Sequence, residues 1–381
     1  MSKSNQKIYL DFASSFEPNP SSIHEYGVSL RKSLENTRGV VAQFINARPS
    51  EIIFTASGTE ANNLAVQGIL RATTLALPHM IATNIEHPSV LETIRALTER
   101  GEITSTIIPV ESNGIVDPKK IKSAITDKTI LVSVMYANNE IGTIEPIAEI
   151  AKAIRHYKKT SGRNNIYFHT DAVQAVNYLP IDVLKLGVDL LTFSGTKVEG
   201  SRGVGVLWKR TGINLAPIMY GGDQEFGLRP GTENTKAILN LGKAIRAISK
   251  TQAKESKRLA LLRDYFFKEI NKSKVFKECG VVVNGDLLSR LPNNINITFP
   301  KIPSELLVIE LSSRGIMTSS KSACKSKEGD GSYVISAIRP EIKEDIGGLR
   351  ISLGKNITKK ELSYTIKSLT NILLKLKGWY H

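Results

Sequence analysis

Short apolar segments alternate with longer amphipathic segments between about residues 50 and 210. The stretch 51–56 (EIIFTA) predicts a buried strand, and 59–73 (TEANNLAVQGILRAT) predicts the helix that follows it. Further strand-like runs lie at 80–84, 103–110, 129–137, 165–171, 188–195 and 203–208. This alternation predicts an α/β fold, with a mainly parallel sheet flanked by helices. Ligands of such sheets bind beyond the carboxyl ends of the strands.

A second, smaller domain is predicted after the turn-rich segment 220–234 (YGGDQEFGLRPGTEN) and a polar-rich helical stretch over 233–272. The rest of the chain predicts a small α+β domain, with strands and helices near 293–300, 303–314, 348–353 and 359–377. We therefore assign residues 21–255 to a large, ligand-binding domain and residues 256–381 to the small domain. Residues 1–20 form an N-terminal segment that we expect to pack with the small domain.

The composition narrows the class of protein. Apolar residues make up 41% and charged residues 23% of the 381 residues, which is typical of a globular chain. No apolar run approaches the roughly 18 residues of a membrane span, and the first residues contain no apolar signal region, so we expect a cytoplasmic protein without a membrane segment. The formal net charge of +15 comes from scattered lysines rather than from one basic tract, so direct nucleic-acid binding is not expected.

The two cysteines are too few for a disulfide framework and lack the spacing of metal ligands, so no metal site is predicted. Cys324 lies in the polar, glycine-bearing stretch 319–333 (SSKSACKSKEGDGSY), which predicts an exposed loop. Lys321, Lys325 and Lys327 would favour its thiolate, which is the nucleophilic form of the side chain. Cys324 is therefore a candidate nucleophile, and an incidental surface cysteine is the alternative.

Polar residues follow several of the predicted strands. Ser57, Gly58 and Thr59 join a strand to a helix, which offers main-chain N–H groups and the positive end of the helix dipole to an anion such as phosphate. His87 follows the next strand, and Asn139 lies beyond another. Each feature alone also has an ordinary structural interpretation, as a helix cap, a structural histidine or a turn.

Two later strand ends add charged residues. Asp171 ends an apolar strand, with Gln174 three residues further on, and a carboxylate at that place needs solvent or a cation such as a protonated ring nitrogen. Ser194, Thr196 and Lys197 lie in a hydroxyl-rich turn, where a lysine can form a Schiff base. A phosphate cradle, an imidazole, a strand-end aspartate and a later lysine are the parts that hold pyridoxal 5'-phosphate (PLP).

These residues lie in motifs that resemble those of the cysteine desulfurases, PLP enzymes of the class V aminotransferase superfamily with fold type I. The motifs occur in family order over almost the whole chain: IYLDFASS, NPSSIHEYG, IIFTASGTEANNLA, IEHPSVL, NGIVD, ILVSVMYANNEIGTIEPI, HTDAVQAV, LPIDV, VDLLTFSGTK, GGDQEFGLRPGTEN, SSKSACKS and LRISLG. The resemblance implies the PLP-dependent transferase fold, a homodimer, and conversion of L-cysteine to L-alanine with transfer of the sulfur to an enzyme cysteine as a persulfide.

The resemblance also implies catalytic and cofactor-binding roles for matching residues. Lys197 corresponds to the lysine that forms the Schiff base with PLP and moves protons. Asp171 corresponds to the partner of the pyridinium nitrogen, and Gln174 to the donor to the phenolic oxygen. His87 corresponds to the catalytic ring that stacks on the cofactor, and Cys324 to the cysteine that accepts sulfur.

Other matches concern the substrate and the phosphate. Asn139 and Arg350 correspond to the groups that bind the substrate carboxylate, a task that suits a bidentate guanidinium. Thr232 corresponds to a phosphate ligand that the neighbouring subunit supplies in this family. Three further positions match phosphate-binding residues of the same subunit: Gly58, Thr59 and Ser194.

The sequence departs from the family at several positions. Thr196 replaces the histidine that usually precedes the Schiff-base lysine, although a threonine can still bond a phosphate oxygen. VEGSRG replaces the usual Tyr-Gly-Pro-Lys-Gly, and Lys321 stands where glycine is common. Between DFASS and NPSS the chain is shorter than the family by a segment that includes a helix. These differences bear on cofactor retention and on access to the substrate channel.

Three interpretations remain open at this point. One is a cysteine desulfurase that passes sulfur to an acceptor protein, either an iron–sulfur scaffold or a tRNA-thiolation enzyme. Another is a different class V PLP enzyme, such as a selenocysteine lyase or an aminotransferase, although transamination needs no loop cysteine. The last is a catalytically idle homologue with a binding role, which the deletion and Thr196 favour and the retained lysine, aspartate, histidine, arginine and cysteine oppose.

Overall fold

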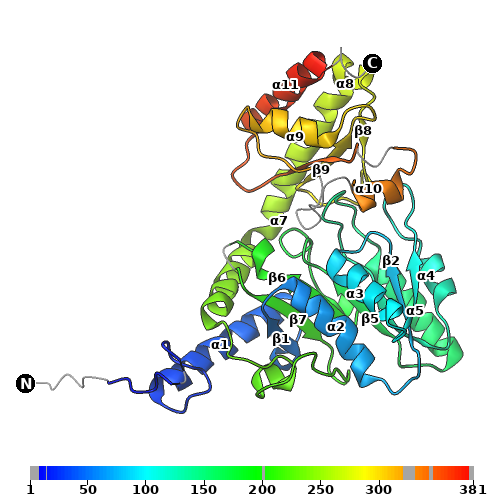
Figure 1. Cartoon of the computed structure of the whole chain (residues 1–381). Helices are drawn as coiled ribbons and strands as arrows, with labels where there is room; N and C mark the ends of the chain where they lie inside the picture. Colours follow the sequence, from blue (N-terminus) through cyan, green and yellow to red (C-terminus); the bar gives the residue numbers. More distant parts are fainter. Residues whose placement is uncertain (1–7, 14, 200–201, 321–330, 343–345, 377–381) are drawn as a thin grey trace, which may run out of the picture.

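The computed structural model describes residues 8–13, 15–199, 202–320, 331–342 and 346–376. Its larger part is built on a seven-stranded sheet (Figure 1). The strands are β1 (Ile52–Thr55), β2 (His79–Thr83), β3 (Thr104–Ile108), β4 (Thr129–Ser133), β5 (Tyr167–Asp171), β6 (Leu190–Ser194) and β7 (Gly205–Lys209). Their order is β1-β7-β6-β5-β4-β2-β3, and all neighbours are parallel except that β7 runs antiparallel to β1 and β6. The predicted α/β class with a mainly parallel sheet is confirmed.

Strand residues alternate between two apolar cores, one on each face of this sheet. Ile52 and Phe54 of β1 join one core and Ile53 joins the other, because successive side chains of a strand point to opposite faces. α1 and α5 pack into the first core, and α2 and α3 into the second. The helices of this part are α1 (Glu25–Phe44), α2 (Gly58–Ala72), α3 (Pro88–Glu99), α4 (Pro118–Ala124), α5 (Ile147–Ser161) and α6 (Val183–Leu186), with the short turns η1 (Pro49–Glu51), η2 (Gly195–Lys197) and η3 (Gln224–Gly227).

A helix of 38 residues, α7 (Thr235–Lys272), joins the large domain to the small one (Figure 1). Its buried residues up to Ile248 contribute to the large-domain core, and those from Leu259 onward contribute to the small-domain core. The small domain has an antiparallel sheet in the order β10-β9-β8. Its elements are α8 (Lys274–Glu278), β8 (Val282–Val283), β9 (Asn294–Thr298), α9 (Ser304–Ser312), α10 (Tyr333–Ile338), β10 (Leu349–Ser352) and α11 (Lys359–Leu376).

α10 differs in its packing from the rest of the C-terminal part of the chain. Val334, Ile335 and Ile338 are buried in the large-domain core rather than in the small-domain core. The C-terminal segment therefore returns to the large domain at this helix, beside the edge of the sheet that faces the small domain (Figure 1).

The described part of the N-terminal segment packs locally, on the start of α1. The Tyr9 ring meets the His24 ring edge-on at 5.7 Å, and Ser22 Oγ donates to Asp11 Oδ2 at 2.8 Å. Residues 8–13 and 15–20 lie at the opposite end of the molecule from the small domain (Figure 1), so these contacts differ from the packing that we expected. Among the described residues, no helix combines the length and apolar character needed to cross a bilayer.

Candidate active site

A cavity of about 280 Å³ opens at the carboxyl ends of the parallel strands. Because these ends meet at one edge of the sheet, residues that are far apart in the chain come together there. Nine of the predicted site residues line this cavity: Gly58, Thr59, His87, Asn139, Asp171, Gln174, Ser194, Thr196 and Lys197.

One end of the cavity presents groups that suit an anion. Ser57 caps α2 by accepting a hydrogen bond from Glu60 N at 3.1 Å, so the cavity faces the positive end of a 15-residue helix. A Cβ atom at Gly58 would lie 3.1 Å from Val173 Cγ2 and 3.2 Å from Ser194 Cβ, so a larger residue would crowd this end. Ser194 Oγ and Thr196 Oγ1 lie 2.9 Å apart and add two hydroxyl groups.

A hydrogen-bond chain joins Asp171 to His87. Asn62 Nδ2 donates to Asp171 Oδ2 at 2.7 Å and to Ser89 Oγ at 2.8 Å, and Ser89 Oγ lies 2.8 Å from His87 Nδ1. Val173 N donates to the other Asp171 oxygen at 2.9 Å. The aspartate is 4% exposed, and none of the ion pairs in the described ranges includes it. The cavity therefore presents a fixed, buried carboxylate that has no cationic partner among the described residues.

Asn62 and Ser89 are functional candidates that the sequence analysis missed. Asn62 is one helical turn beyond Thr59, and Ser89 is two residues beyond His87, so both lie in motifs that had been recognised. Their spacing from the predicted site residues was the available signal. The hydrogen-bond partner of each side chain depends on how α2 and α3 pack together, and this packing cannot be read from the sequence.

Lys197 lies in η2, directly after β6, and its side chain lines the cavity. Asn177 Nδ2 donates to the main-chain carbonyl of Lys197, which holds the turn in place. Among the ion pairs of the described residues, none involves the Lys197 amine. The amine is thus available to a ligand in the cavity.

Arg350 on β10 of the small domain does not line the cavity but contacts Asn139, which does. Its Nη1 donates to the main-chain oxygen of Asn139 at 3.2 Å, so the two predicted substrate-binding residues are neighbours. Asn139 Oδ1 is buried and has no hydrogen-bond partner among the described residues, which leaves it available to a ligand. Thr232 lies exposed before α7 and outside the cavity lining, and Cys324 lies outside the described residues.

Two buried carboxyl groups lie close behind the cavity. Burial raises the pKa of Glu86, which directly precedes His87, to about 8, and the nearby charges of Asp171 and Glu145 add to that effect. Burial also raises the pKa of Glu145 to about 8, although Val116 N donates to its Oε2 at 2.9 Å. Both carboxyl groups are therefore largely protonated at neutral pH.

Replacing Glu145 with glutamine is expected to reduce the loss of stability with rising pH. The folded protein keeps the Glu145 proton up to about pH 8, whereas the unfolded chain releases it near the ordinary value of 4.5. The free energy of unfolding therefore falls as the pH rises through that window, by at most about 1.4 kcal/mol per pH unit for this carboxyl. Denaturant titrations between about pH 5 and pH 8.5 measure this slope.

Glu111→Gln is the matched control, because Glu111 is an exposed carboxylate beside Lys120. The free energy of unfolding of Glu111→Gln should depend on pH as that of the wild type does. A Glu145→Gln protein that loses stability as steeply as the wild type would contradict a protonated Glu145 in the folded state.

The sequence matches the family profile described as Aminotransferase class-V over residues 3–364. The fold and the residues that line the cavity agree with this enzyme class. The chain is 43% identical to "Cysteine desulfurase IscS" of Dictyoglomus turgidum over 359 residues, 94% of this chain and 88% of that protein. It is 40% identical to the protein of the same name from Clostridium botulinum strain Hall, over 93% of this chain and 87% of that protein. The chain belongs to the cysteine desulfurases of the class V aminotransferase family.

A solved structure supports the same assignment. The structure of a "NIFS-LIKE PROTEIN" superposes with a TM-score of 0.84 at 31% identity, covering 94% of this chain and 92% of that chain. The predicted transferase fold is thereby confirmed.

Proposed function

We propose that this protein binds PLP and converts L-cysteine to L-alanine, with transfer of the sulfur to Cys324. The observation that carries the proposal is the cavity that brings Lys197, Asp171 and His87 together, in a chain 43% identical to a cysteine desulfurase. The same cavity contains the anion site at the start of α2, which suits the phosphate of PLP.

The residues present fit the cofactor. The Asp171 carboxylate is buried, is held by two N–H donors and lacks a cation in the described structure, and a protonated ring nitrogen would supply that cation. The hydroxyl groups of Ser194 and Thr196 and the α2 terminus would hold the phosphate. Thr196 therefore contributes a hydroxyl where the family usually has a histidine.

Bound PLP supplies an electron sink for the bond between Cα and hydrogen of an amino acid. Lys197 would attach the cofactor through Nζ and would move the α-proton. His87, held at Nδ1 by Ser89, would pack against the ring, and Gln174 would donate to its phenolic oxygen. Arg350 and Asn139 would bind the substrate carboxylate at the rim of the cavity.

The overall change balances without an external oxidant or reductant. L-Cysteine differs from L-alanine by one sulfur atom, which the Cys324 thiolate accepts as a persulfide. The bond between the substrate carbon and sulfur breaks, a bond between two sulfur atoms forms, and the carbon gains a proton. The persulfide would then pass its outer sulfur to an acceptor protein, for iron–sulfur cluster assembly or tRNA thiolation.

We also propose a homodimer. Thr232 lies exposed on the turn before α7 and does not line the cavity of its own chain, as expected for a residue that serves a second copy. Sedimentation of the purified protein would measure the dimer directly.

The proposed reaction is tested with the wild-type protein. We expect a purified protein that absorbs in the visible region, and equal amounts of alanine and reducible sulfur after addition of L-cysteine. 3-Mercaptopyruvate in place of alanine, with the sulfur retained, would indicate an aminotransferase, and a reaction with L-selenocysteine alone would indicate a selenocysteine lyase. A protein that stays colourless with added PLP and turns over neither amino acid would refute the proposal and leave a binding role.

A further inference from the structure

Two consecutive hydroxyl side chains at the start of α10 reach the turns that carry site residues. We propose that Ser332 and Tyr333 are positioning residues, whose hydrogen bonds fix the turns of His87 and Asn139 relative to each other. The inference rests on the proposed function, which gives those two residues their roles toward PLP and the substrate.

Tyr333 holds the turn that leads into α3. Its hydroxyl donates to the main-chain oxygen of Glu86 at 2.6 Å, directly before His87. Glu86 is fully buried, and its side chain is bound in turn by Thr83 Oγ1 at 2.6 Å and Met135 N at 2.9 Å. The Tyr333 bond therefore attaches α10 to a turn that is otherwise held from within the large domain.

Ser332 holds the turn that follows β4. Its Oγ donates to Glu140 Oε2 at 2.5 Å, directly after Asn139, and both side chains are buried. The main-chain oxygen of Glu140 accepts further bonds from Asn294 and Asn296 of β9, at 2.9 and 3.0 Å. Ser332 of α10 and the two asparagines of β9 thus bind this turn from two sides.

The two turns are also bonded to each other through Asn138. Its Nδ2 donates to Ile85 O at 3.0 Å, and its Oδ1 accepts from Glu140 N at 2.8 Å and from Ile141 N at 3.0 Å. A displacement of either turn therefore changes the distance between the His87 ring and Asn139. Tyr333 and Ser332 bond this network to the start of α10.

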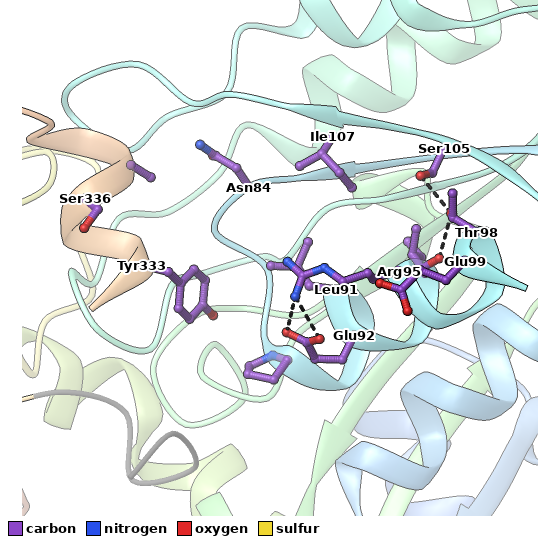
Figure 2. Close-up of a pocket in the computed structure, with 13 residues that line it drawn as sticks. Asn84, Leu91, Glu92, Arg95, Thr98, Glu99, Ser105, Ile107, Tyr333 and Ser336 are labelled. Carbon is purple, nitrogen blue, oxygen red and sulfur yellow. Dashed lines mark hydrogen bonds and ion pairs between the residues drawn. The ribbon is translucent and has the colours of Figure 1, made fainter. Parts of the chain in front are cut away.

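A groove lies on one side of α10. The groove of about 500 Å³ lies between α3, β3 and α10, and it is lined by Leu91, Ile107, Tyr333 and Ser336 among others. Figure 2 shows Tyr333 pointing from α10 toward the turn before α3, with Ser336 further along the same helix. α10 also packs on the large-domain core through Val334, Ile335 and Ile338, so the polar contacts of Ser332 and Tyr333 add to an apolar attachment.

The test compares Tyr333→Phe and Ser332→Ala with controls that make the same chemical change elsewhere. Tyr265→Phe removes a hydroxyl that bonds Ser363 on the small domain, and Ser336→Ala removes one that lines the groove. Ser332 Oγ also caps α10 by accepting a hydrogen bond from Ile335 N, so Ser332→Ala removes two bonds. Ser332→Thr keeps the hydroxyl that makes both bonds and should behave as the wild type.

Loss of one such hydrogen bond changes the equilibrium or rate constant that depends on it by about 5- to 30-fold. For Tyr333→Phe we expect PLP to dissociate faster by that factor and the visible circular dichroism of bound PLP to change, with the KM for L-cysteine nearly constant. For Ser332→Ala we expect the KM for L-cysteine to rise by a similar factor. In the cofactor-free protein, amide exchange of residues 85–87 should be faster in Tyr333→Phe than in Tyr265→Phe.

The inference is overturned if Tyr333→Phe matches Tyr265→Phe in cofactor dissociation, dichroism and amide exchange. It is also overturned if both α10 variants lower the melting temperature while KM and dichroism stay as in the wild type, because α10 would then have a purely structural role. A wild-type protein without desulfurase activity would refute the proposed function instead. The exchange comparison in the cofactor-free protein would still decide whether α10 fixes the two turns.

Discussion

Alanine formation from L-cysteine is expected to fall by at least about 10³-fold when Lys197 is replaced with alanine. The Lys197 side chain lines the cavity directly after β6, and in the described structure its amine has no ion pair that would hold it elsewhere. The substitution removes the amine that attaches the cofactor and moves the α-proton. Alanine quantification and the visible absorbance of the purified protein measure the two consequences, and both should be lost.

Lys185→Ala is the control for this substitution, because the Lys185 side chain is 86% exposed on α6, away from the cavity. That variant should equal the wild type in activity and absorbance. A Lys197→Ala protein that keeps more than about a tenth of the wild-type rate would show that another group performs these tasks.

Replacing Cys324 with alanine is expected to lower sulfur release on the order of 10³-fold while the visible absorbance of the protein is preserved. Cofactor attachment depends on the cavity, whereas sulfur transfer depends on a thiolate nucleophile, so the two substitutions should separate these functions. Sulfide released by a reductant after addition of L-cysteine measures the transfer. Mass spectrometry of the wild-type protein should find one additional sulfur atom on Cys324.

The chain offers a matched control in Cys279, its other cysteine, which is half-buried against the small-domain core. Cys279→Ala should transfer sulfur at the wild-type rate. If the additional sulfur is found on Cys279, or if Cys324→Ala releases sulfide normally, the assignment of the acceptor cysteine is wrong.

The sequence predicted the sheet well because its strands are short and apolar, and all except the edge strand β3 are largely buried on both faces. Alternating residues such as Ile52, Ile53 and Phe54 go to different cores, so the strand is apolar throughout and is easily detected. The strand-end residues were found for a related reason. Parallel strands end at a common edge, so the polar residue that follows each strand belongs to one site.

The details that depend on packing between distant segments were not predictable from the sequence. Asn62 reaches Asp171 because α2 lies over the end of β5, and Arg350 reaches Asn139 because β10 lies beside the turn after β4. The burial of Val334 in the large-domain core is a further example, since a short apolar helix carries no mark of the core that it joins. The local packing of the N-terminal segment, in which the Tyr9 ring meets the His24 ring, was also not predicted.

The sharing of α7 between two cores has a consequence for how this enzyme unfolds and evolves. Ile245 and Phe266 lie on one continuous helix but are buried in different cores, so a break in α7 would deprive both cores of side chains at once. Loss of α7 structure in the small domain would shorten the same helix that packs in the large domain, and we infer that the two domains unfold cooperatively. Recombination between relatives that cuts within this helix would have to match the packing of both halves.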